Sequence, residues 1–258
     1  MKQIFALILC LAAAIPSFAA TLAQQADSAY NREEYRQAIE FYNQAIVEDG
    51  PGTDVYYNLG NAYYRNDNLG KAVVAYERAL RIDPTNDDAR HNLEFVRTRI
   101  QDRPEDDSAF LTNLHYSIMN SMTANAWAWT ALVLFVLVLG AIALYIFAPA
   151  VNLRKTGFFG GIVLLLAFIY TLVLAQGSAS RSQSHESAVV IVPMTQLNSV
   201  PRAVRGSDDR VVPIHEGTCV EIVDSVATPD DPVSPMWYSV KINNSTRAWL
   251  RASDVERI

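Results

Sequence analysis

Cysteine is nearly absent from this sequence, and so are the motifs of the common enzyme classes. The 258 residues include two cysteines, Cys10 and Cys219, and four histidines without metal-ligand spacing. No glycine-rich phosphate loop, G-x-S-x-G or H-E-x-x-H pattern occurs. We therefore expect a protein that is not an enzyme and that holds neither a metal nor a cofactor.

An excess of positive charge is also missing. The chain carries 21 Lys and Arg against 27 Asp and Glu, a net charge of −6 with an isoelectric point of about 5.2. Proteins that bind nucleic acid in general carry a basic face. Nucleic acid is therefore excluded as an expected partner.

Two long stretches, residues 127–147 and 157–175, contain no charged residue at all. At about 1.5 Å per residue, helices of these lengths extend roughly 31 and 28 Å, close to the thickness of a hydrocarbon core. We predict two transmembrane helices. Because neither contains an ionisable side chain, no proton or ion pathway is expected.

The short segment between these stretches carries a local positive charge. Arg154 and Lys155 are the only basic residues between Arg103 and Arg181. The positive-inside bias places their loop, residues 148–156, in the cytoplasm and both flanking regions on the opposite side. These two residues are the predicted determinants of topology.

The N-terminus has the pattern of a secretory signal peptide over residues 1–19. One basic residue precedes an apolar run, and Ser17 and Ala19 are small where signal peptidase requires small residues. An uncleaved anchor is the alternative. After cleavage only Cys219 would remain, as a small buried strand residue, so that no intramolecular disulfide could form.

Residues 23–101 repeat with a period of 34, since 72 − 38 = 34. Small and aromatic residues recur at this spacing: Ala38, Tyr42 and Ala45 return as Ala72, Tyr76 and Ala79. This pattern resembles the tetratricopeptide repeat. The second copy matches at Tyr56, Leu59, Gly60, Tyr63, Ala72, Tyr76, Ala79 and Pro84. We expect two repeats and a capping helix in an α-helical solenoid.

The resemblance implies a concave face that binds a segment of a partner protein. The corresponding groove residues in this sequence are Tyr57, Asn61, Tyr64, His91 and Asn92. Basic residues that grip a terminal carboxylate in some members of the family are largely missing here. The alternative interpretation is that the aromatic residues only pack successive repeats together.

Two further segments flank the predicted spans. Residues 102–126 contain apolar residues at helical spacing, which predicts a juxtamembrane amphipathic helix. It would lie on the membrane surface or dock onto the repeats. Residues 176–187 are rich in serine, which predicts a flexible linker.

Residues 188–258 consist of short β-rich runs separated by turn signals. With Trp237, Tyr238 and Trp249, this segment resembles the bacterial SH3-like domains, and we expect a small all-β barrel. The resemblance leaves two functions open, cell-wall binding and contact with another protein. The chain would thus be a membrane-anchored protein with two arms, and neighbouring domains or partners could supplement the short repeat array.

The order of these modules resembles the BatE-like proteins of Bacteroides aerotolerance operons. The resemblance implies a scaffold in the bacterial inner membrane, with both folded domains in the periplasm. Its partners would be von Willebrand A-domain membrane proteins and a MoxR-type ATPase, in stress resistance or aerotolerance. A tether that binds peptidoglycan through the SH3-like domain is the alternative, and the oligomeric state stays open.

Overall fold

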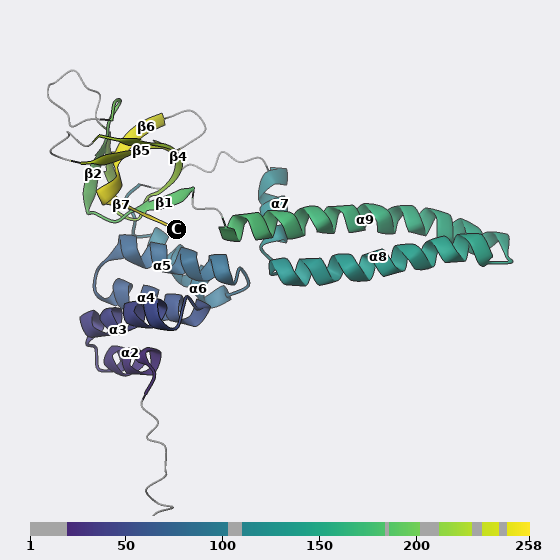
Figure 1. The fold of residues 1–258 in the computed structure, drawn as a ribbon, viewed down its shortest axis with the longest axis horizontal. Coiled ribbons are helices and arrows are strands. Elements are labelled where there is room, and N and C mark those ends of the chain that lie inside the picture. Colours follow the sequence, from purple (N-terminus) through teal and green to yellow (C-terminus); the bar gives the residue numbers. More distant parts are fainter. Residues whose placement is uncertain (1–19, 103–109, 184–185, 202–211, 229–233, 243–246) are drawn as a thin grey trace, which may run out of the picture.

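The computed structural model describes residues 20–102, 110–183, 186–201, 212–228, 234–242 and 247–258 (Figure 1). The expected signal peptide lies outside these residues. The described helices are α2 (Leu22–Asn31), α3 (Tyr35–Glu48), α4 (Thr53–Arg65), α5 (Leu69–Ile82), α6 (Asp87–Arg97), α7 (Phe110–Met119), α8 (Ala124–Phe147) and α9 (Val151–Gln183).

The helices α2 to α6 stack as the repeat pattern predicts (Figure 1). Small residues at the repeating positions let neighbouring helices approach closely: a Cβ added at Gly60 would lie 2.6 Å from the ring of Tyr76. The stack begins with a capping box, in which the Gln24 N–H donates to Thr21 Oγ1 over 3.2 Å. The predicted α-helical repeat region is thus present.

The helices α8 and α9 form an antiparallel hairpin that projects away from the rest of the molecule (Figure 1). Their mean hydropathies are 2.7 and 2.5, and 11% of the most apolar window of each is buried. A core helix of a soluble protein would be mostly buried. These two helices therefore have the length, composition and exposure that a membrane span requires.

The two helices of the hairpin are in close contact near the turn. A Cβ added at Gly157 would lie 2.8 Å from both the Ala141 carbonyl oxygen and the Tyr145 nitrogen. Glycine at this position thus permits a helix–helix approach that a side chain would prevent.

The turn of the hairpin is shorter than the expected loop at 148–156. The helix α8 ends before Pro149, since a proline cannot continue a helix. The helix α9 already begins at Val151, because the residues after the proline are compatible with a helix. Arg154 Nε donates to the Ala148 carbonyl oxygen over 2.8 Å, which satisfies a carbonyl group at the end of α8. Arg154 and Lys155 therefore lie within the first turns of α9.

The prediction of a flexible linker at 176–187 is wrong over most of its length, since α9 continues to Gln183. Contacts with the segment after α7 favour this continuation. Arg181 Nη1 donates to Asn120 Oδ1 over 2.9 Å, and a Cβ added at Gly177 would lie 2.9 Å from the sulfur of Met119. Tertiary contacts here override the weak helix propensity of serine and glycine.

The C-terminal region is an antiparallel sheet of order β6-β5-β4-β1-β7, with a separate pair β2-β3. Its strands are β1 (Ser187–Val190), β2 (Met194–Leu197), β3 (Val212–His215), β4 (Cys219–Ala227), β5 (Met236–Lys241), β6 (Arg247–Arg251) and β7 (Val255–Arg257). In the described residues the sheet does not close, which corrects the expected barrel. The edge strands β6 and β7 do not pair with each other, and Glu256 of β7 contacts Arg78 of α5.

The sheet packs directly on the helical repeats (Figure 1). Val189 of β1 and Ile258 belong to the same buried cluster as Val73 of α5 and Val96 of α6. At the closest point, a Cβ added at Gly70 would lie 2.6 Å from the Val190 carbonyl oxygen. The two extracytoplasmic arms expected from the sequence, the repeats and the sheet, therefore share one core.

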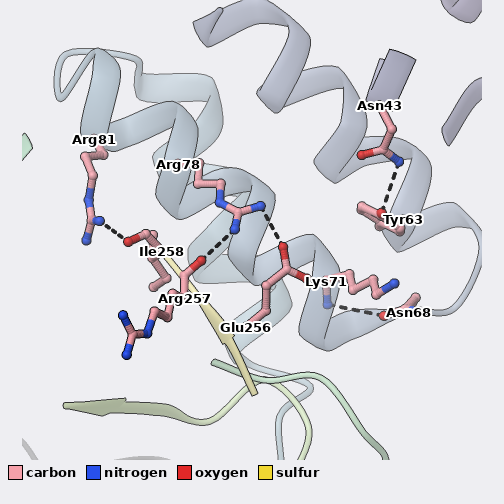
Figure 2. A network of polar contacts seen from close by, with 9 residues as sticks. All are labelled: Asn43, Tyr63, Asn68, Lys71, Arg78, Arg81, Glu256, Arg257 and Ile258. Atoms are coloured by element: carbon pink, nitrogen blue, oxygen red, sulfur yellow. Dashed lines mark hydrogen bonds and ion pairs between the residues drawn. The ribbon is translucent and has the colours of Figure 1, made fainter. Parts of the chain in front are cut away.

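Polar contacts border this shared core (Figure 2). Arg78 of α5 donates to the Glu256 carboxylate and to the Arg257 carbonyl oxygen, each over 2.6 Å, and Arg81 donates to the Ile258 carbonyl oxygen. The side chains of Arg78 and Glu256 are 30% and 33% exposed, so their ion pair is partly shielded from water.

A second polar contact lies where the chain leaves α6. Asp102 accepts a hydrogen bond from the His215 N–H over 2.6 Å and lies 3.0 Å from His215 Nδ1. The sheet is thus fixed to the repeats on two sides of the apolar contact.

Gly70→Ala should weaken this contact, because the added methyl group would meet backbone atoms of β1. Overpacking costs about 1–3 kcal/mol, against a gain in helix propensity of up to about 1 kcal/mol. We expect the thermal unfolding midpoint of the detergent-solubilised protein to fall by a few degrees. Gly160→Ala is the control, since a methyl group there meets nothing within 4 Å; equal midpoints for the two variants would contradict the described contact.

Candidate functional site

The candidate site lies on the face formed by α2, α4 and α6, the first helices of successive repeat units. Residues 34 positions apart occupy equivalent places in successive repeats, and 27 + 34 = 61 and 61 + 34 = 95 give one such set. These positions hold Asp27, Asn61 and Phe95. The regular stacking of the helices brings such side chains next to one another.

Three of the five predicted groove residues form one hydrogen-bond network. Asn92 Nδ2 donates to Asn61 Oδ1 over 2.9 Å and to the Tyr57 hydroxyl over 3.4 Å. The buried Tyr76 donates its hydroxyl proton to the same Asn61 oxygen over 2.7 Å. Asn61 is thereby held in one orientation, and its amide nitrogen donates to no other residue in the described part of the chain.

The other two predicted residues lie outside this network. The ring of Tyr64 is 5.8 Å from the ring of Phe95, and the Arg99 guanidinium lies 5.3 Å above Tyr64. His91 is exposed on α6, and no hydrogen bond or ring contact joins it to the other four among the residues that the structure describes. The structure therefore unites Tyr57, Asn61 and Asn92 but leaves His91 apart.

A second polar cluster, centred on Asp27, extends the network toward α2. The Tyr42 hydroxyl donates to Asp27 Oδ1 over 2.6 Å, and Asn58 Nδ2 donates to the same oxygen over 3.3 Å. Burial, and next the hydrogen bond to Asp27, raises the pKa of Tyr42 above its ordinary value, so that the hydroxyl stays protonated and donates.

A cavity of about 330 Å³ opens between the two clusters, lined by Asp27, Tyr30, Asn31, Tyr42, Asn58 and Asn61. Its lining offers amide, hydroxyl and carboxylate groups, with no basic side chain among these six. Such groups match the alternating donors and acceptors of a peptide backbone, and the lone carboxylate favours a ligand without negative charge.

Sequence reasoning did not identify Asp27, Tyr42 and Asn58 as site residues. Tyr42 was expected as a packing residue of the repeat, and its hydroxyl group adds a polar role. The 34-residue period could have identified Asp27 as a site residue, because it lies one period before Asn61.

No group of three or more His, Cys, Asp or Glu side chains that could hold a metal ion occurs within the described residues. Burial raises the pKa of the Cys219 thiol, which keeps it protonated and weakly nucleophilic.

Comparison with known families agrees with the geometry of the helices. A sequence model of the tetratricopeptide repeat matches residues 53–86, which cover α4 and α5. No curated protein sequence matches the chain. The predicted tetratricopeptide repeat is thus confirmed over this segment, and repeats of this class generally mediate contacts between proteins.

Tyr42→Phe tests the cluster centred on Asp27. The substitution keeps the buried ring and removes the hydroxyl group, and the loss of such a hydrogen bond costs about 1 kcal/mol. We expect the unfolding midpoint to fall by about 2–4 °C. Tyr116→Phe, at a half-exposed tyrosine of α7, is the matched control; a Tyr42→Phe variant as stable as this control would show that the hydrogen bond contributes nothing.

Proposed function

We propose that this protein is a membrane-anchored scaffold without enzymatic activity, whose repeats bind an extended segment of a partner protein. The observation that carries the proposal is the groove formed by the polar cavity between α2, α3 and α4, beside the hydrogen-bond network that joins α4 to α6. There, Asn61 is held by Tyr76 and Asn92 while its amide nitrogen stays available for a ligand. An oriented amide of this kind can clamp a peptide group of the bound segment at low entropic cost.

The chemistry of the cavity defines which segment fits. Asp27 is the one charged residue among the six that line it, and one of its oxygens already accepts two hydrogen bonds. A terminal carboxylate would face this charge without a basic side chain beside it in the lining. We therefore infer that the groove takes the middle of a chain rather than its end.

The hairpin and the shared core support the proposed membrane arrangement. The helices α8 and α9 are antiparallel, so a hairpin that spans a bilayer returns both flanks to the same side. The contact between the repeats and the sheet requires the same arrangement. With Arg154 and Lys155 at the turn, the proposal places the turn in the cytoplasm and the folded unit in the periplasm of a bacterial inner membrane.

We also propose a pathway, a set of partners and a fold family for the C-terminal sheet. The module order supports a BatE-like role with von Willebrand A-domain membrane proteins and a MoxR-type ATPase in aerotolerance, and the C-terminal sheet would be a variant of the SH3-like fold. The tether to peptidoglycan is less well supported. In a free-standing domain, the edge strand β7 and Val189 of β1 would lie at the surface. Here they are covered by α5.

The groove is tested by crosslinking in native membranes, followed by mass spectrometry. The double variant Tyr57→Ala with Asn61→Ala removes two groove contacts worth about 1 kcal/mol each, so we expect capture of partner proteins to fall about tenfold or more. The control is Gln44→Ala with Val47→Ala, at two exposed positions of α3.

Unfolding midpoints are compared in parallel, so that loss of the fold is distinguished from loss of binding. If the groove variant folds and captures the same partners as the control variant, the groove assignment is wrong.

A further inference from the structure

The helix α7 exposes large apolar side chains that no described residue covers. Phe110, Leu111 and Leu114 are 78%, 73% and 45% exposed. Because successive residues of an α-helix are rotated by about 100°, these three side chains and Ile118 lie within one sector of about 100°. The opposite sector contains the polar Thr112.

The other side of α7 is fixed to the hairpin. Met119 is buried in a cluster with Trp127 of α8 and Leu174 of α9, and the Trp127 indole N–H donates to the Met119 carbonyl oxygen over 3.1 Å. One turn earlier, His115 Nδ1 lies 3.3 Å from the Tyr170 hydroxyl. These contacts attach α7 to the hairpin.

The level of these contacts along α9 coincides with the end of its apolar stretch, residues 157–175. Tyr170 and Leu174 belong to the last turns of that stretch. Arg181, which follows about 10 Å farther along the helix, donates to Asn120 just after α7. At a membrane interface, aromatic residues gather where a span changes from apolar to charged residues. Trp127, Tyr170 and His115 lie at this level.

We propose that α7 is an interfacial helix that inserts Phe110, Leu111 and Leu114 into the boundary between headgroups and acyl chains. The occupant of this face is the lipid bilayer, because the apolar sector of α7 is continuous with the hairpin: Ile118, in the same sector, packs against the cluster of Met119, Trp127 and Leu174. The helix lies beside the outer end of the hairpin, between the spans and the folded unit (Figure 1).

This inference rests on the proposed membrane hairpin and adds a second contact with the same leaflet. Two attachments, one spanning and one lying in the interface, restrict the tilt of the hairpin and the height of the groove above the membrane. The groove would then meet its partner at a defined distance from the bilayer surface.

The test uses the full-length protein with Cys10→Ser and Cys219→Ala, and with a single cysteine at Leu111 or, as the matched control, at Thr112. Each variant is labelled with an environment-sensitive fluorophore and reconstituted in vesicles of phosphatidylcholine and phosphatidylglycerol. Quenching is measured with lipids that carry a nitroxide near the headgroup. We expect at least twofold stronger quenching at position 111 than at position 112.

A third variant, Val136→Cys in the middle of α8, tests the membrane hairpin separately from the interfacial helix. Quenching of its label by nitroxides deep in the acyl chains shows that the hairpin spans the bilayer. If that label is quenched while positions 111 and 112 behave alike, α7 is not interfacial and only this inference fails. If the label at position 136 is not quenched, the membrane hairpin fails, and the interfacial helix fails with it.

Discussion

The close approach of α5 to β1 is the contact on which the arrangement of this molecule depends. Gly70 allows the helix to reach the backbone of Val190, and Val73 and Val189 then become part of one core. The second helix of a repeat usually has one face in water. Here that face is covered by a sheet from the C-terminal end of the chain, which follows the hairpin in the sequence.

This contact compensates for the small size of the repeat array. Two repeats and one capping helix bury little apolar surface, and terminal helices of such arrays need cover. The sheet supplies it: Ile100, just after α6, is buried and lies against Gly217 at the turn before β4. In return, the repeats cover the edge strand β7, which would otherwise be open to pairing with another chain. The groove is lined by residues of α2, α3 and α4 and by none of the sheet.

Features with a regular period or a uniform composition could be predicted from the sequence. The 34-residue period predicted that α4 and α6 stack as neighbours, and this stacking brings Tyr57 and Asn61 within hydrogen-bond distance of Asn92, although no two of the three are one period apart. The absence of charge was sufficient to predict the helices of the hairpin. The docking of the sheet could not be predicted, since Val73 and Val74 read as ordinary core residues of a repeat. Likewise, the helical state of the Ser-rich segment is explained by its tertiary contacts with Asn120 and Met119, which the sequence pattern does not reveal.

The shared core of repeats and sheet is tested most directly by crosslinking within one chain in native membranes. In a background with Cys10→Ser and Cys219→Ala, cysteines replace Arg78 and Glu256, and a short bismaleimide is added. The control pair replaces Arg32 and Glu256, since α2 lies at the end of the stack far from the sheet (Figure 1). We predict efficient linkage within one chain for the first pair and little for the control. Equal linkage of the two pairs would show that the sheet moves independently of the repeats and would contradict the account.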